Sequence, residues 1–143
     1  MVYLLFNFFS YQSIHTCCYI QRKVMKMYKK GDIILFHVKH KDSKYCYRGR
    51  HLGIVVSNNK HNNSANTLLI LPLSSKIHKA NNRFNILIQR EEADIPLNKD
   101  SICLINQLQT ISKENVIRKI SHIDTKGNFY KFLIKKICNF IND

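Results

Sequence analysis

Runs of apolar residues separated by polar segments predict a chain built mainly of short β-strands. Six runs either alternate between apolar and polar positions or are rich in β-branched and aromatic residues, which is typical of strands. They cover residues 33–38, 51–57, 67–73, 84–90, 101–105 and 117–123. The polar segments 39–50, 58–66 and 91–99 are expected to be loops, because turn-forming and charged residues dominate them.

A helical pattern replaces the strand pattern near the C-terminus. From Asp124 or Thr125 onward, apolar residues recur at helical spacing, with lysines on the other face. The apolar positions are Phe129, Phe132, Leu133, Ile137, Phe140 and Ile141. A shorter helix is predicted from Ser112, a good N-cap, to about Val116. The elements together predict a mainly β fold, a small β-barrel with the C-terminal helix packed on it through Phe129, Leu133 and Ile137.

The first residues of the chain differ from everything that follows. Residues 1–24 contain no acid, lack the pattern of a signal peptide and are too often interrupted by polar residues for a membrane span. Met25 and Met27 follow directly, ahead of the first predicted strand. We therefore predict a separate N-terminal extension, 1–24, and one domain, 25–143. A true start at Met25 or Met27 is favoured over a loosely attached apolar arm, and no membrane partner is expected.

The charge of the chain is strongly positive and unevenly distributed. Its 143 residues include 23 Lys and Arg against 9 Asp and Glu, a formal net charge of +14. Between residues 39 and 90 there are ten basic residues and one acid, Asp42, whereas four acids gather in 91–100. A local excess of this kind favours a polyanionic partner, either nucleic acid or an acidic protein, over a surface that is basic only for solubility.

Cysteine and histidine spacing points away from a bound metal. The five cysteines are odd in number and form no C-x-x-C pair, so a reduced, cytoplasmic protein is expected. Cys103 and Cys138 lie in apolar runs and are predicted to be small core residues. His37 and His40 are three positions apart, which places them on opposite faces of a strand. We expect no metal and no cofactor.

Candidate catalytic and ligand-binding residues lie at the start of the second predicted strand and at the end of the third. Cations and a histidine precede the second strand, and hydroxyls and a lysine close the third: Arg48, Arg50, His51, Ser74, Ser75 and Lys76. If these strands pair in antiparallel fashion, the two groups lie at the same side of the sheet. Aromatic rings among cations in 44–50 also suit single-stranded nucleic acid, because bases stack on the rings. A loop that packs its tyrosines on the barrel is an equally good interpretation of that segment.

Several pieces of the chain, taken in order, resemble the MazF/PemK toxins of bacterial toxin–antitoxin pairs. The matching pieces are 30–33, 54–59, 67–77, 99–104, 107–113 and 119–123. No single piece is specific, but their order and spacing are those of the family. The resemblance implies an SH3-like barrel, a homodimer, an acidic antitoxin partner and metal-independent, ribosome-independent cleavage of single-stranded RNA.

The resemblance also implies two catalytic positions. The family places an arginine, usually followed by proline, at the start of its second strand, and a threonine or serine after its third. The hydroxyl falls on Ser74, whereas the arginine's place falls on His51, with Leu52 instead of proline and Arg50 one residue earlier. The family's usual loop is replaced by 41–47. Asn106 and Gln109 stand where a glutamate and an arginine are common.

Cleavage through the 2′-hydroxyl of RNA needs a base, an acid and stabilisation of charge on the phosphate. We predict Arg50, His51 and Ser74 as the catalytic residues. Arginine binds phosphate as a fork, histidine changes charge near neutral pH, and a serine hydroxyl donates to a phosphate oxygen. Predicted RNA-binding residues are Lys44, Tyr47, Arg48, Ser75, Lys76 and Lys79. Without the resemblance, a simpler interpretation is favoured over catalysis. In that interpretation Ser74 only ends a strand, and His51 is an exposed residue at the start of one.

A non-catalytic binding protein of the same fold is the alternative. The CcdB toxins share this barrel and bind a gyrase subunit instead of cutting RNA. A degenerate relative that only binds RNA or an antitoxin is a further form of this alternative. Cleavage of RNA without a divalent metal separates the enzyme from both.

Overall fold

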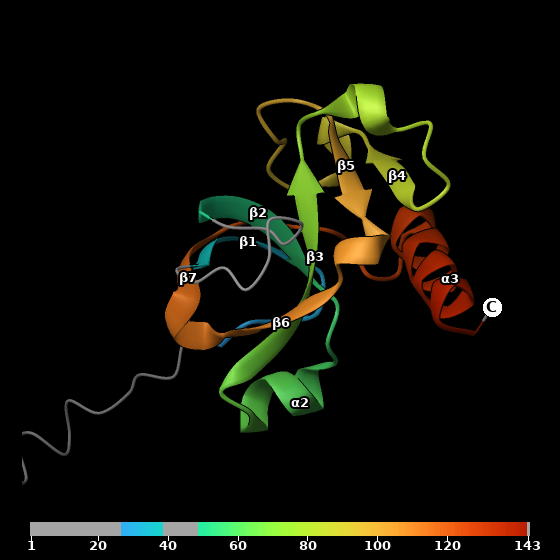
Figure 1. Cartoon of the computed structure of the whole chain (residues 1–143). Coiled ribbons are helices and arrows are strands. Elements are labelled where there is room, and N and C mark those ends of the chain that lie inside the picture. Colours follow the sequence, from blue (N-terminus) through green and yellow to red (C-terminus); the bar gives the residue numbers. More distant parts are fainter. Residues whose placement is uncertain (1–26, 39–48, 143) are drawn as a thin grey trace, which may run out of the picture.

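The computed structural model describes residues 27–38 and 49–142, which form one antiparallel sheet with two helices (Figure 1). The strands are β1 (Asp32–Val38), β2 (Gly49–Val55), β3 (Thr67–Ser74), β4 (Asn85–Ile88), β5 (Ser101–Leu104), β6 (Gln109–Ser112) and β7 (Val116–His122). The helices are α2 (Asn59–Ser64) and α3 (Asn128–Asn142). Single 3₁₀ turns form η1 (Ile77–Lys79), η2 (Arg90–Glu92), η3 (Ile105–Gln107) and η4 (Lys113–Asn115). The predicted extension, 1–24, lies outside the described residues.

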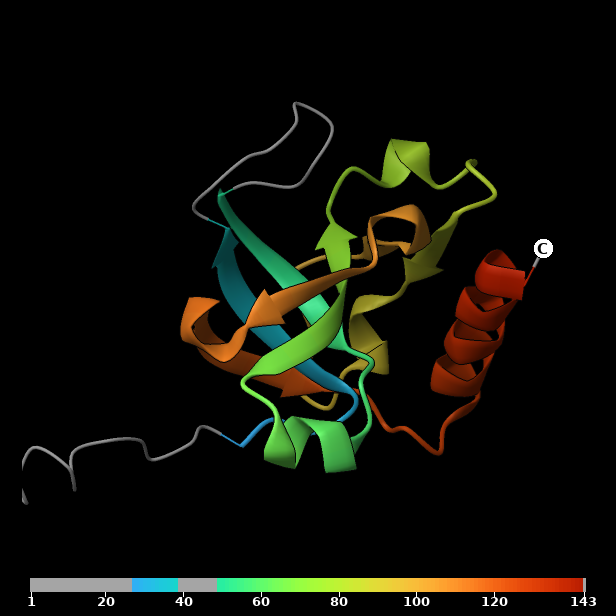
Figure 2. The ribbon, with the colours of Figure 1, turned by 60° about the horizontal axis from the view of Figure 1, so that its bottom comes forward.

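The sheet curves strongly around its longest strand. Its strand order is β4-β5-β3-β2-β1-β7, and β6 pairs separately with β3. The N-terminal half of β3 pairs with β6, from Thr67 to Ile70, whereas Leu73 and Ser74 pair with β5. Figure 2 shows β1, β2, β3, β6 and β7 wrapped around one another. The predicted barrel-like fold is confirmed. Among the described strands, however, β6 and β7 do not pair, so the curved sheet stays open between them.

The two faces of the curved sheet carry separate apolar cores. The core inside the curve contains Tyr28, Ile34, Phe36, Val55, Leu68, Ile70, Ile111 and Val116. The core on the other face lies between the sheet, β4, β5 and α3, and includes Ile33, Ile54, Leu71, Leu73, Ile88, Cys103, Leu133 and Ile137. Successive residues of a strand point to opposite faces, so the near-continuous apolar runs of β1 and β3 serve both cores at once.

Most of the predicted strands are confirmed, with differences at their ends. The fourth strand is shorter than predicted, because Arg90 begins η2 and its backbone N–H donates to the Asp100 carboxylate at 2.9 Å. The short helix predicted from Ser112 is the 3₁₀ turn η4, and the Ser112 hydroxyl caps it by accepting from the N–H of Glu114. Strand β6 was not predicted, since its four residues are mostly polar and too few to show a period.

The loop predicted for 58–66 is wrong, because this segment contains helix α2. The Asn58 side chain caps the helix by accepting from the N–H of His61 at 2.8 Å. Asn62 is fully buried, and its side-chain amide donates to the Ser57 carbonyl at 3.0 Å. Capping and one buried polar contact therefore turn a segment of turn-forming residues into a helix.

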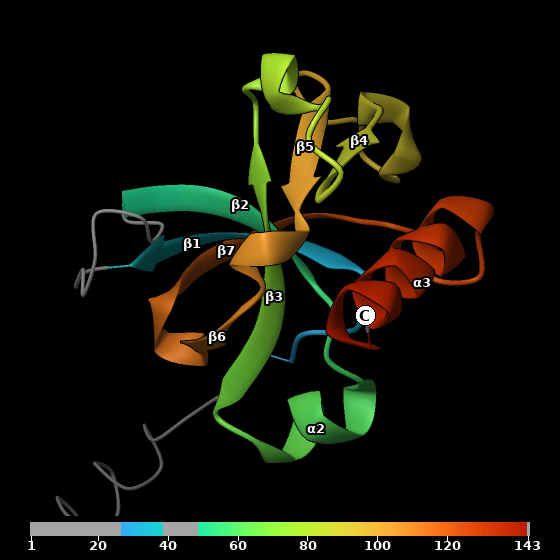
Figure 3. The same ribbon diagram turned by 45° about the vertical axis from the view of Figure 1, so that its right-hand side comes forward.

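Helix α3 is confirmed, but its buried face differs in part from the predicted one. Tyr130, Leu133 and Ile137 are buried, and Phe129 packs at the edge of the core. The predicted positions Phe132, Phe140 and Ile141 are 47%, 40% and 66% exposed, and Cys138 is exposed too. The helix lies beside the β4 end of the sheet (Figure 3). There Phe140 meets Phe84 edge to face at 5.2 Å and Lys136 lies over Phe132, so partial contacts shield apolar side chains outside the core.

A tight connection fixes the start of β1. Gly31 has a φ of +92°, a left-handed conformation that favours glycine. Its N–H donates to the Val55 carbonyl at 2.8 Å, and its own carbonyl accepts from Ile123 at 2.9 Å. One residue later, the buried Asp32 carboxylate meets Lys119 at 2.7 Å. The chain around Gly31 thus joins β2, β1 and the end of β7.

Candidate nucleic-acid interface

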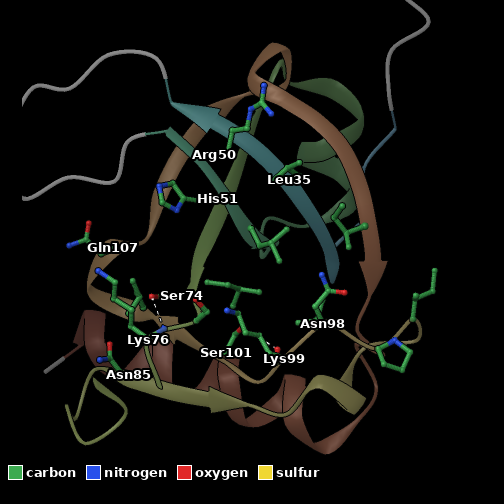
Figure 4. A pocket seen from close by; sticks show the side chains of 18 of the residues that line it. Leu35, Arg50, His51, Ser74, Lys76, Asn85, Asn98, Lys99, Ser101 and Gln107 are labelled. Carbon is green, nitrogen blue, oxygen red and sulfur yellow. Dashed lines mark hydrogen bonds between the residues drawn. The ribbon is translucent and has the colours of Figure 1, made fainter. Parts of the chain in front are cut away.

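An open groove of about 990 Å³ lies where β2 begins and β3 ends, and the predicted site residues gather there (Figure 4). Its walls come from β1, β2, β4, β5 and β7, from the end of β3, and from the segments before β4 and on either side of β5. The lining residues are Leu35, Arg50, His51, Leu52, Leu73, Ser74, Ser75, Lys76, Asn82, Asn85, Ile95, Pro96, Leu97, Asn98, Lys99, Ser101, Leu104, Asn106, Gln107, Arg118 and Ile120.

All the charged residues described in the lining of the groove are basic. Its charged lining residues are Arg50, Lys76, Lys99 and Arg118, and none of the described residues that line it is an aspartate or glutamate. Apolar side chains form much of its floor, and side-chain amides and hydroxyls lie between the cations. A groove with this lining suits an anionic ligand that also carries apolar surface and hydrogen-bonding groups.

The antiparallel pairing that brings the site together is present. Strand β2 pairs with β3 with Leu52 opposite Leu73, so the first residues of β2 lie beside the last residue of β3. Arg50, His51, Ser74, Ser75 and Lys76 all line the groove. The predicted residues Lys44, Tyr47 and Arg48 lie outside the described residues. Lys79 is the last residue of η1, and its side chain is not among those that the structure describes.

Within the groove, strand alternation separates Arg50 from the other two predicted catalytic residues. His51 pairs with Phe36, and their rings lie 6.3 Å apart, so His51 is on the face of the inner core. Ser74 is on that same face, because it follows Leu73, which belongs to the outer core. Arg50 points to the opposite face. In Figure 4 the His51 ring accordingly lies between Arg50 on one side and Ser74 with Lys76 on the other.

The Ser74 hydroxyl is held at the turn after β3. Its oxygen accepts a hydrogen bond from the N–H of Lys76 at 3.3 Å, drawn as a dashed line in Figure 4. A hydroxyl that accepts in this way still has its own hydrogen to donate. Ser74 is half-buried, whereas Ser75 and Lys76 are exposed. Ser74 is therefore able to donate to an anion in the groove, while Lys76 adds positive charge beside it.

Sequence reasoning missed several groove residues that come from distant parts of the chain. Arg118 and Ile120 belong to β7, and Asn98 and Lys99 precede β5. Strand β7 was predicted, but its pairing with β1, which places Arg118 beside Leu35, was not. The apolar and β-branched residues of 117–123 predicted a strand there, but a strand alone does not identify its partner.

One carboxylate anchors the wall of the groove that contains Ile95 and Pro96. Asp94 accepts hydrogen bonds from the Ser121 hydroxyl at 2.6 Å and from the N–H groups of His122 and Ile95 at 2.7 Å each. The Ser121 hydrogen bond is the main cause that holds the pKa of Asp94 below its ordinary value of 3.8, followed by the backbone bond from His122. Ionised Asp94 therefore fastens this segment to the end of β7.

Replacing Asp94 with alanine is expected to lower the free energy of unfolding by about 1 kcal/mol at pH 7, since Asp94 is exposed and its hydrogen bonds are partly screened. The folded-state pKa lies below the unfolded one, so this contribution is present above about pH 4 and is lost as the pH falls through the folded pKa. Urea denaturation at pH 7 and pH 3 measures it. Glu92→Ala, a nearby exposed acid, is the control, and an equal loss at both pH values would contradict the prediction.

No group of three or more His, Cys, Asp or Glu side chains in 27–38 and 49–142 is arranged to hold a metal ion. No helix in the same residues has the length and apolar character needed to cross a bilayer.

Solved structures with the same fold are found among bacterial toxins. A MazF from Deinococcus radiodurans has a TM-score of 0.66 at 9% identity, covering 82% of this chain and 98% of its own. The Mycobacterium tuberculosis toxin MazF-mt6 has a TM-score of 0.59 at 12% identity, covering 78% and 96%. An endoribonuclease in complex with its cognate antitoxin from a mycobacterial species has a TM-score of 0.54 at 14% identity, covering 80% and 91%. No curated protein matches by sequence.

The curved antiparallel sheet and its packed C-terminal helix define a small, MazF-type β protein, which carries a basic groove. The sequence profile of PemK-like, MazF-like toxins of type II toxin–antitoxin systems matches residues 29–127. The chain therefore belongs to this toxin family, and the resemblance read from its sequence pieces is confirmed.

Proposed function

We propose that this toxin is an endoribonuclease that cuts single-stranded RNA in the groove, without a metal ion. The observation that carries the proposal is a groove lined by four cations and by no described acid, with His51 and Ser74 on one face of adjacent strands. An RNA backbone supplies the negative charge that this groove lacks. Its bases supply flat apolar surface and polar edges for the floor and the amides.

Each groove residue has a role in this chemistry. The 2′-oxygen of the RNA attacks the adjacent phosphorus, and the bond from phosphorus to the 5′-oxygen of the next nucleotide breaks. Ser74 donates a hydrogen bond to a phosphate oxygen as charge develops there. His51, on the same face, exchanges a proton with the attacking or departing oxygen. Lys76 and Arg50 hold the phosphodiester chain on either side.

The test is incubation of the purified protein with a mixed RNA in EDTA, followed by mapping of the new ends. Cleavage is expected at a restricted set of sites and with 2′,3′-cyclic phosphate ends, because the 2′-oxygen is the nucleophile. A Ser74→Ala variant prepared in the same way controls for contaminating nucleases. Intact RNA at high protein concentration would favour a binding protein of the same fold, an interpretation that the histidine at the family's arginine position also suits.

We further propose a homodimer inhibited by an acidic antitoxin that covers the groove. The formal charge of +14 and a groove lined by no described acid favour an acidic partner. A partly disordered acidic peptide can wrap such a surface and become ordered on binding. The mycobacterial structure described above is that of a toxin-fold enzyme with its antitoxin, and C2 dimers are the commonest oligomers.

The affinity of that acidic partner is expected to fall as salt rises, because screening weakens attraction between exposed charges. Titration calorimetry of the toxin with its antitoxin, or with an acidic peptide cut from it, measures this dependence between 50 mM and 500 mM salt. The Lys76→Ala variant should show a weaker dependence, and Lys131→Ala, on the exposed face of α3, should match the wild type. An affinity unchanged across that range would contradict the electrostatic account.

A further inference from the structure

Strand β7 brings a second arginine to the groove on the face opposite His51 and Ser74. Leu35 of β1 pairs with Leu52 of β2 on one side and with Arg118 of β7 on the other. Arg50 is two residues before Leu52 and therefore shares its face. Arg50 and Arg118 thus stand on the same face of the sheet, with β1 between them, and both line the groove.

The spacing of these two arginines suits two neighbouring groups of one extended ligand. Adjacent strands lie about 4.8 Å apart, so two strands separate the backbones sideways by roughly 10 Å, and two residues along a strand add about 7 Å. Long arginine side chains shorten or lengthen this separation by several ångströms. The two guanidinium groups can therefore hold successive phosphates of one strand.

Both arginines lack a neutralising partner among the described residues. Neither makes an ion pair with a described acid, in contrast to Arg90, which meets Glu91 at 3.1 Å, and Lys119, which meets buried Asp32. On this face β1 presents Leu35 and His37 between them, with His37 opposite Arg50. Leu52 and Ile120 extend the apolar surface around Leu35. Two exposed guanidinium groups that pair with no described acid, beside apolar side chains, form a surface to which an anion with a flat apolar part can bind.

The rest of the groove favours nucleic acid over an acidic peptide as that ligand. Five side-chain amides line it: Asn82, Asn85, Asn98, Asn106 and Gln107. An amide both donates and accepts hydrogen bonds, as base edges do, whereas a carboxylate only accepts. Guanidinium groups in turn match phosphate as planar forks.

We propose that Arg118 and Arg50 form a second phosphate-binding site, distinct from the His51–Ser74 face, which takes a nucleotide flanking the cleaved bond. The proposal rests on the proposed RNA substrate and extends it. The phosphate of the flanking nucleotide lies between the two guanidinium groups, and its base lies on the apolar floor. The protein then requires a single strand that extends beyond the scissile dinucleotide, and it holds that strand through Arg118.

The test is the dependence of affinity on oligonucleotide length, measured by fluorescence anisotropy with 2′-O-methyl RNA, which cannot be cut through its 2′-oxygen. A dinucleotide and an octanucleotide are compared with wild type, Arg118→Ala, Arg118→Lys and, as a matched control, Arg90→Ala. The wild type and Arg90→Ala are expected to bind the octanucleotide much more tightly than the dinucleotide. Arg118→Ala should reduce this ratio about tenfold and lower the slope of log affinity against log salt by about 0.7. Arg118→Lys should restore the salt slope but only part of the ratio.

The outcomes separate this inference from the proposed activity. If RNA is not cut but the ratio depends on Arg118, the second site stands and the nuclease proposal falls. If RNA is cut and Arg118→Ala leaves the ratio unchanged, the second site falls. Weaker binding of a polyglutamate peptide by Arg118→Ala, with oligonucleotide affinity unchanged, would assign the arginine to an acidic protein and overturn the inference. Thermal melting of each variant confirms folding, which exposed Arg118 should not affect.

Discussion

Replacing Ser74 or His51 with alanine is expected to slow RNA cleavage by about 10²–10³-fold, while RNA remains bound. Removing a donor to the developing phosphate charge, or a proton-transfer group, costs a factor of this size. The two residues share one face at the adjoining ends of β2 and β3, so both are positioned to act on one phosphate. Single-turnover cleavage of an oligonucleotide with one ribonucleotide at a mapped site measures the rate.

Arg50→Ala separates the two interpretations of the missing family arginine. Because Arg50 points to the other face, its loss should weaken RNA binding and change the rate of cleavage less than His51→Ala. His51→Arg, which restores the residue that the family resemblance implies, should keep much of the rate. A severe Arg50→Ala together with a mild His51→Ala would mean that Arg50 has taken over the family's role by a one-residue shift. Full activity in the combined Arg50, His51 and Ser74 alanine variant would remove the site.

Gly31→Ala is expected to destabilise the fold by about 3 kcal/mol or more, and to lower the melting temperature by roughly 10 °C. A β-carbon at this position would lie 2.7 Å from the Ile123 carbonyl oxygen and 2.7 Å from a methyl group of Thr125. The left-handed φ of +92° adds strain of its own. Backbone hydrogen bonds hold Gly31 to Val55 and to Ile123. The backbone therefore cannot move apart to relieve the clash without breaking them. Thermal and urea unfolding measure the loss.

Gly49 is the matched control for this prediction. Its φ is +83°, but a β-carbon there would meet no atom of the described residues within 4 Å. Gly49→Ala therefore carries the conformational strain alone, about 1 kcal/mol. If both variants lost the same stability, packing around Gly31 would not be the reason for the glycine.

The sequence predicted the strands more fully than their pairing. Apolar, β-branched runs located β1, β2, β3, β5 and β7, because each run is long enough to show a pattern. Strand β6 and helix α2 were missed, since their formation depends on a partner strand and on the Asn58 cap rather than on a period. The face of α3 was predicted only in part, because apolar residues at neighbouring positions allow more than one buried stripe.

The candidate site shows the same limit at the level of single residues. Antiparallel pairing predicted that the start of β2 lies close to the end of β3. The candidate residues at both places line the groove. The division of Arg50 from His51 and Ser74 follows from strand alternation, once β1 and β3 give the register. The position of Arg118 required the pairing of β1 with β7, whose paired residues are 80 to 90 positions apart. Distant pairing of this kind leaves little trace in one sequence.

The pairing of β1 with the last strand has a consequence for synthesis of the protein. Until β7 leaves the ribosome, β1 has β2 on one side and an open edge on the other, and an open edge can pair with other chains. Long-range strand pairing is also slow to form. A nascent chain ending before Val116 lacks both the partner of β1 and Arg118. The complete groove therefore forms only after β7 has been synthesised.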